Sequence, residues 1–210
     1  MSLDLPRPIT YLITTGECDT SNFAHTSGRL LNVVRAAVDT GVQMIQIREK
    51  LLTGNLLSEL AERVVEITRS SSSKLLINDR LDIALATGAD GVHLTSTSLP
   101  VGVVRESCPD DFIVGLSVHT EDEALEAAAG RADFVLFGPV FPSPGKGCGV
   151  GLHALRDVCS SAGSLPVLAV GGIDESNARS VLDAGAAGFA AIRSLNDPEV
   201  MHRMSRSIQA

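Results

Sequence analysis

The chain has 210 residues, of which 44% are hydrophobic and 20% charged, and its formal charge is −8. This composition is typical of a globular protein with a substantial core, and the acidic balance argues against a nucleic-acid surface, which needs a net basic face. Six Phe, one Tyr and no Trp make the expected core aliphatic.

The cysteines and the N-terminus indicate a cytoplasmic protein. Cys18, Cys108, Cys148 and Cys159 show no CxxC spacing, so neither a zinc site nor a disulfide framework is expected. The first residues, MSLDLPRPITYL, lack the features of a signal peptide, and no apolar run approaches the roughly 20 residues of a membrane span. We expect no membrane partner.

Eight short apolar runs are predicted to be β-strands. Their Val, Ile and Leu content is nearly continuous, as in parallel strands that are covered on both faces. In chain order they span residues 9–15, 44–49, 74–79, 91–95, 112–119, 134–141, 166–173 and 188–195.

Helical segments alternate with these strands, and a weak internal repeat supports the count. ATGADGVHL (86–94) and DAGAAGFAA (183–191) share a Gly that ends a helix, a short turn and a new strand. Helices are predicted over 57–68, 121–130, 153–161, 175–185 and 198–209. The alternation predicts an α/β fold, a single (β/α)8 TIM barrel over residues 1–210. An open doubly wound sheet is the rival, weakened because ITTGECDTSN replaces a GxGxxG after the first strand.

Polar residues gather where the predicted strands end. Because active sites of such barrels lie at the C-terminal ends of the strands, this convergence indicates an enzyme. The residues concerned are Arg48 to Lys50, Asn78, Asp79, His93 to Thr95, Ser117, His119, Ser143 to Lys146, Gly171, Gly172, Arg193 and Ser194.

The stretch MIQIREK (44–50) carries three polar groups on one face of a strand. Alternation places Gln46, Arg48 and Lys50 together and Glu49 on the opposite face. With Lys146 from a later loop, they would form an anion pocket suited to pyrophosphate. The alternative is a solvated strand end in which the cations pair with Glu49 and other carboxylates.

VGGIDESN (170–177) reads as a phosphate site. Gly171 and Gly172 would let the backbone approach a ligand, and Asp174 or Glu175 would cap the next helix. Backbone donors after strands 7 and 8 of a barrel often bind phosphate. The alternative is a glycine turn without a ligand.

Asp79 and two histidines complete the candidates. Asp79 could hold Mg²⁺ against a pyrophosphate, or it could simply cap the helix that starts near Arg80. His119 could be a general acid or base, or it could only orient a neighbour. His93, within its strand, is expected to be structural.

At this point the residues resemble a known family. QIREK, INDRLDIALATGADGVHL, GLSVH, FGPVFPSPGK and PVLAVGGIDESNA, in this order, are similar to thiamin phosphate synthases and the related thiazole tautomerases. The resemblance covers about residues 9–196. It implies that a pyrimidine pyrophosphate loses pyrophosphate and that the nitrogen of a thiazole phosphate captures the resulting cation.

The resemblance also implies roles for single residues. Ser117 would stabilise the departing group, and Ser143 stands where the family usually has Thr. The remaining implied roles are pyrophosphate binding by Arg48, Lys50 and Lys146, shared contacts by Gln46 and Asn78, Mg²⁺ binding by Asp79, and thiazole phosphate binding by Gly171 and Gly172.

Two departures from the family pattern matter. HLTSTSLP places Ser98 where synthases usually have a second Mg²⁺-binding Asp, and Arg193 replaces a small Ser at the phosphate site. Both lean toward the tautomerase, which would use His119 and no metal. Three interpretations therefore stay open: synthase, tautomerase, or a non-catalytic binder of thiazole or thiamin phosphate. The sequence leaves the oligomeric state and the role of Cys148 open as well.

Overall fold

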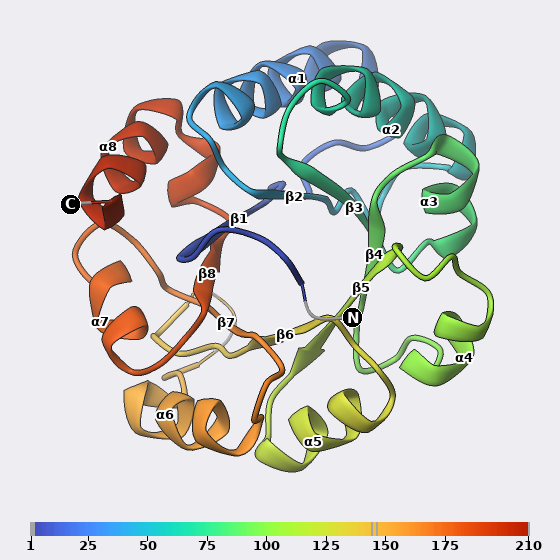
Figure 1. The fold of residues 1–210 in the computed structure, drawn as a ribbon. Helices are drawn as coiled ribbons and strands as arrows, with labels where there is room; N and C mark the ends of the chain where they lie inside the picture. Colours follow the sequence, from blue (N-terminus) through green and yellow to red (C-terminus); the bar gives the residue numbers. More distant parts are fainter. Residues whose placement is uncertain (1–2, 144, 146, 210) are drawn as a thin grey trace.

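The computed structural model describes residues 3–143, 145 and 147–209. Its eight strands pair in parallel in the order β1 to β8, and β8 pairs with β1 to close the barrel (Figure 1). The strands are β1 (Ile9–Ile13), β2 (Met44–Ile47), β3 (Lys74–Asn78), β4 (Gly91–Leu94), β5 (Ile113–Val118), β6 (Phe134–Phe137), β7 (Val167–Val170) and β8 (Gly188–Ala191).

A ring of helices surrounds the barrel (Figure 1). They are α1 (Phe23–Asp39), α2 (Gly54–Thr68), α3 (Leu81–Thr87), α4 (Val101–Glu106), α5 (Glu121–Ala129), α6 (Gly151–Ser161), α7 (Ala178–Asp183) and α8 (Pro198–Gln209), with a 3₁₀ turn at Ser194–Asn196. The predicted (β/α)8 barrel is confirmed, and an open sheet is excluded. The strands end earlier than predicted because their last polar residues leave the ladder and turn into the loops.

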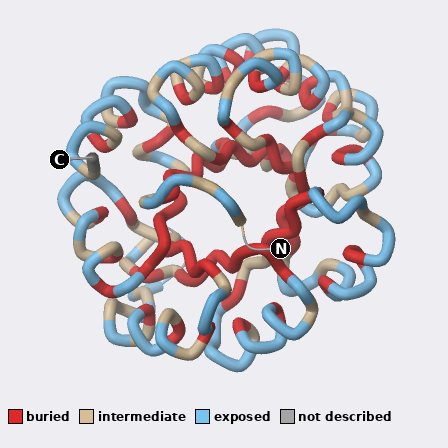
Figure 2. Tube along the Cα trace, viewed as in Figure 1, coloured by how far each residue is buried: buried red, intermediate tan, exposed pale blue. Residues whose placement is uncertain are grey.

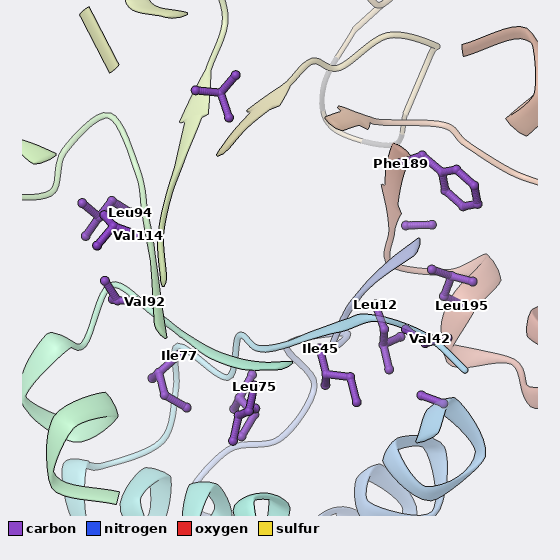
Figure 3. Close-up of a cluster of buried hydrophobic side chains, with 14 of the residues drawn as sticks. Leu12, Val42, Ile45, Leu75, Ile77, Val92, Leu94, Val114, Phe189 and Leu195 are labelled. Carbon is purple, nitrogen blue, oxygen red and sulfur yellow. The ribbon is translucent and has the colours of Figure 1, made fainter. Parts of the chain in front are cut away.

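Alternating residues along each strand divide the core into two parts. Outward-facing side chains pack against the helices, as Figure 3 shows for Leu12, Ile45, Leu75 and Ile77. Inward-facing side chains form a separate cluster inside the barrel that includes Tyr11. Strands buried on both faces account for the continuous apolar runs in the sequence, and they form the buried ring in Figure 2.

Three side chains tie strands together at the N-terminal end of the barrel. Gln43 Oε1 accepts a hydrogen bond from Thr10 N at 2.8 Å, and Asp90 Oδ2 accepts one from Leu75 N at 2.9 Å. Asp133 Oδ2 accepts one from the β5 backbone and also binds a buried arginine. Each acceptor immediately precedes an even-numbered strand and binds the strand before it.

The segment before β1 covers this N-terminal end (Figure 1). Leu3 and Leu5 pack against the cluster inside the barrel. With one mouth covered, the open mouth is the one formed by the C-terminal ends of the strands. Among the described residues, no helix has both the length and the apolar character that crossing a membrane requires.

Candidate active site

A cavity of about 720 Å³ opens at the C-terminal ends of the strands. This size lies within the range of small-molecule sites. It brings together most of the residues that the sequence singled out, from seven of the eight strand ends. Its lining includes Gln46, Arg48, Lys50, Asn78, His93, Ser117, His119, Ser143, Gly171, Gly172 and Arg193. Lys146 lies outside the described residues.

Glu49 explains why its neighbours face the cavity. Its side chain is only 3% exposed. Its carboxylate accepts hydrogen bonds from Gly16 N at 3.1 Å and Cys18 N at 2.8 Å. The Glu49 carboxylate therefore binds the backbone of the loop after β1. The alternative in which Glu49 neutralises Arg48 and Lys50 is wrong.

The cavity cations are not paired in salt bridges with carboxylates of the described residues. Within the described part of the chain, Arg48, Lys50 and Arg193 form no salt bridge, whereas Lys74 and Arg105 at the other end of the barrel are each paired with a carboxylate. Arg48 is held by its backbone, since its N–H donates to Thr14 Oγ1 at 2.8 Å. The arrangement leaves positive charge free for anionic ligands.

Gln46 and Asn78 form an amide pair in the cavity. Gln46 is 1% exposed and its Nε2 donates to Asn78 Oδ1 at 3.2 Å. Gln46 Oε1 is buried and has no partner among the described residues. A buried polar atom without a partner is costly, so this oxygen is available to accept a further hydrogen bond.

Asp79 adjoins the main cavity rather than lining it. It lines a smaller neighbouring cavity that shares Lys50 and Asn78 with the larger one. Its φ of 59° places it in the left-handed region, and the Ser98 hydroxyl donates to its Oδ1. Asp79 does not cap the next helix, because the N-cap of α3 is Arg80.

The donors around Asp79 fit a single-carboxylate cation site. In the described residues no group of three or more His, Cys, Asp or Glu could hold a metal. Mg²⁺, however, is often bound by one or two carboxylates together with substrate phosphates. Asp79, with the hydroxyls of Ser98 and Thr95 in contact with one another, fits that requirement.

Gly171 and Gly172 lie on the side of the cavity opposite Arg48's strand, after β7. Their φ values are 98° and 64°, and a Cβ at Gly172 would lie 2.6 Å from Pro142 O. The loop after β6 packs so closely that a side chain at either position would overlap it. The sequence analysis missed this reason for the two glycines. The packing of a distant loop leaves no local signal in VGGIDESN.

The expected helix cap after these glycines is wrong. Helix α7 begins three residues later than predicted, and its N-cap is Asn177. Asn177 Nδ2 donates to Gly172 O at 2.8 Å and its Oδ1 accepts from Asp174 N. Hydrogen bonds from Ser176, and to a lesser degree the charge of Arg193, lower the pKa of Asp174. Asn177 thereby fixes the glycine turn.

His119 lies at the cavity rim with a fixed ring orientation. Its Nδ1 is 2.6 Å from Gly138 O. A carbonyl oxygen only accepts, so Nδ1 carries a proton, and Nε2 has no hydrogen-bond partner among the residues that the structure describes. The ring could accept or transfer a proton at Nε2.

His93 is the cavity residue whose surroundings sequence reasoning underestimated. It is 2% exposed, and its Nε2 lies 2.9 Å from Ser117 Oγ. Burial, and to a lesser degree the charge of Arg48, lower its pKa to about 3. Its imidazole is therefore neutral. The signal in the sequence was its place on the inward face of β4, two residues before the strand's polar end.

The loop after β6 contributes Ser143, whose Oγ donates to Phe141 O at 3.2 Å. Cys148, in the same loop, is an exposed free thiol. It does not line the cavity. The structure gives Cys148 no chemical role.

The fold and the cavity define a class: a (β/α)8-barrel enzyme whose strand ends surround an anion-attracting site. A family model described as thiamine monophosphate synthase matches residues 10–195. The chain belongs to the thiamine monophosphate synthase family.

Individual relatives agree with this assignment. The thiamine-phosphate synthase of Chlorobium phaeovibrioides is 40% identical over 200 residues, covering 92% of this chain and 90% of the relative. That of Methanoculleus marisnigri is 43% identical over 164 residues, covering 77% of each. The solved thiamine phosphate pyrophosphorylase of Pyrococcus furiosus superposes with a TM-score of 0.82 at 31% identity, covering 96% and 95% of the two chains. The resemblance and the expectation of a transferase of thiamin biosynthesis are confirmed, and the tautomerase is not favoured.

Proposed function

We propose that the cavity joins a pyrimidine pyrophosphate to a thiazole phosphate and releases pyrophosphate. The observation that carries the proposal is that cations lie on two sides of one cavity and form no salt bridge with the described residues. Arg48 and Lys50 face one anion, and Arg193 with the glycine turn faces the other. Two separate anion sites suit two phosphorylated substrates better than one.

The amide pair suits the pyrimidine. Gln46 Oε1 offers an acceptor, and Asn78, whose Oδ1 is already bonded, offers its NH₂ as a donor. An aminopyrimidine edge presents the complementary groups, an N–H donor beside a ring-nitrogen acceptor. The pyrimidine would then lie deep in the mouth, with its pyrophosphate toward Lys50.

The reaction breaks a C–O bond and forms a C–N bond. The bond electrons leave with the pyrophosphate, and the thiazole nitrogen donates its lone pair to the pyrimidine-methyl carbon. Arg48 and Lys50 stabilise the charge that develops on the leaving group, as preorganised cations do for departing oxyanions. The implied Lys146 would add to them, and Ser143 lies in the same loop. No protein nucleophile is required.

Mg²⁺, when bound, would supply further charge neutralisation at the pyrophosphate. Asp79 would hold it, and Ser98 and Thr95 would contribute only neutral oxygens. Asp79 and Lys50 line the same smaller cavity, which supports a position of the Asp79 carboxylate close to the pyrophosphate. Arg48 and Lys50 would therefore stabilise more of the charge on the leaving pyrophosphate than cations do in a site with two Mg²⁺-binding carboxylates.

The test is an assay of the purified protein with both substrates and Mg²⁺, which should yield thiamin phosphate and pyrophosphate. Arg48→Ala should lose about 2–4 kcal/mol of transition-state stabilisation. Arg69→Ala, which removes an exposed arginine outside the cavity, is the matched control and should change nothing. Absence of pyrophosphate release at saturating Mg²⁺ would reject the proposal.

The tautomerase keeps one specific observation in its favour, the free Nε2 of His119. The same protein should therefore be given a thiazole carboxylate phosphate in EDTA. Isomerisation that His119→Ala abolishes, without any pyrophosphate release in the first assay, would transfer the assignment to that reaction. Tight binding of thiazole phosphate without turnover in either assay would indicate a binder.

A further inference from the structure

The His93 imidazole is held on three sides. Its Nε2 contacts Ser117 Oγ at 2.9 Å. Its ring lies 5.9 Å from the Tyr11 ring and 5.7 Å from the Phe134 ring, measured between centroids. Gly115 makes room for this packing, because a Cβ there would lie 2.2 Å from the tip of the Phe134 ring. The ring therefore has one orientation.

The second ring nitrogen decides which atom carries the proton. His93 Nδ1 is buried and has no partner among the described residues. Buried N–H groups without a partner are rarer than buried acceptors without one. The neutral ring therefore carries its proton on Nε2 and leaves the bare lone pair at Nδ1.

We propose that His93 is a positioning residue that donates its Nε2–H to Ser117 Oγ and so directs the Ser117 hydroxyl proton into the cavity. Ser117 Oγ accepts from His93, and its own proton has no acceptor in the described part of the chain. Ser117 is thereby a donor toward the ligand. The inference rests on the proposed function only for the identity of that ligand, the pyrimidine pyrophosphate.

This arrangement gives Ser117 a chemical direction that a free serine lacks. A hydroxyl can donate or accept and rotates to suit its neighbours. With His93 fixed, no rotation is needed when negative charge develops on the leaving group. A donor aimed beforehand is worth more than one that must reorient during the reaction.

The first test reads the tautomer without any turnover. A ¹H–¹⁵N spectrum of the histidine-labelled protein should show one buried ring that is protonated on Nε2 and bare at Nδ1. The signal is assigned to His93 by its loss in His93→Gln. A proton on Nδ1, or a doubly protonated ring, would overturn the proposal.

The second test uses two amides of different reach. Gln places its terminal amide near the position of His Nε2 and can still contact Ser117, whereas Asn cannot. Ser117→Ala should lower kcat by about 10²-fold, as for the loss of one preorganised donor. His93→Asn should lower kcat by at least about tenfold, as for the loss of an orienting partner. His93→Gln should recover most of that loss, with KM little changed.

Coupling between the two residues distinguishes positioning from general damage. In the Ser117→Ala background, His93→Asn should cause no further loss of kcat, because the group it positions is gone. Equal losses in both backgrounds, or equal losses for Gln and Asn, would overturn the proposal. His202→Asn, an exposed control, should have no effect. If the wild type releases no pyrophosphate, the proposed function fails, and the tautomer test still decides the role of His93.

Discussion

Among the side chains that hold the loops at the cavity mouth, we expect the Glu49 carboxylate to contribute most to the free energy of unfolding. It accepts two backbone hydrogen bonds, from Gly16 and Cys18, and is 3% exposed. Hydrogen bonds to charged groups contribute about 1.5–3 kcal/mol each. Glu49→Ala should therefore lower the free energy of unfolding by about 3–6 kcal/mol, toward the lower end if water replaces the carboxylate.

Glu49→Gln separates charge from shape. The amide keeps one acceptor oxygen, but its NH₂ faces a backbone N–H, so one bond is lost and two donors are opposed. We expect a loss of about 2–3 kcal/mol. Urea unfolding followed by circular dichroism measures both variants. Glu66→Gln, an exposed glutamate on α2, is the control and should stay within about 0.5 kcal/mol of the wild type.

The loop should also report on catalysis. An ideal Cβ on Gly16 would lie 3.6 Å from Arg48 Nη1, so the loop that Glu49 holds runs beside the guanidinium. Loosening it should raise KM for the pyrophosphate substrate in Glu49→Gln. If Glu49→Gln unfolds at the same urea midpoint as the wild type and its KM is unchanged, the Glu49 carboxylate does not hold this loop.

Three further variants test other contacts. Tyr11→Phe should raise the free energy of unfolding by about 1 kcal/mol, because the buried hydroxyl has no partner in the described chain; a clear loss in a urea titration would reveal one. Gly115→Ala should lower Tm by several degrees in calorimetry, because the new Cβ would overlap the Phe134 ring; an unchanged Tm would mean that the ring can move aside. Ser98→Asp should lower the Mg²⁺ concentration for half-maximal activity by adding a carboxylate beside Asp79, whereas neutral Ser98→Asn should not; equal responses would count against a cation there.

The sequence predicted the barrel because every strand is covered on both faces and therefore reads as a continuous apolar run. It predicted the cavity because polar side chains gather where the strands end, at the C-terminal mouth of the barrel. Both patterns are local, and a (β/α)8 barrel converts them into one location.

What the sequence could not predict depends on contacts between distant segments. Glu49 looked like a partner for its neighbouring cations, but its acceptors are satisfied by amides more than 30 residues away. The cap of α7 was misplaced because Asn177 binds back to Gly172 O. From the sequence His93 was expected to be structural. The structure places Ser117, on the neighbouring strand, within hydrogen-bonding distance of its ring.

The acceptors at the closed end of the barrel divide it into unequal parts. Gln43, Asp90 and Asp133 each fasten an odd strand to the even strand that follows, joining β1 to β2, β3 to β4 and β5 to β6. The fourth pair has Ala187 at the equivalent position, with no side-chain acceptor, and Gly188 follows, where a Cβ would lie 2.0 Å from Ile9 O. Among the four pairs of an odd strand with the even strand after it, three thus carry this side-chain hydrogen bond and the β7–β8 pair does not. Thermal opening of the barrel should therefore start between β7 and β8. Their C-terminal ends lead into the glycine turn and Arg193. The side of the cavity mouth that would bind the thiazole phosphate is then the side that moves most easily.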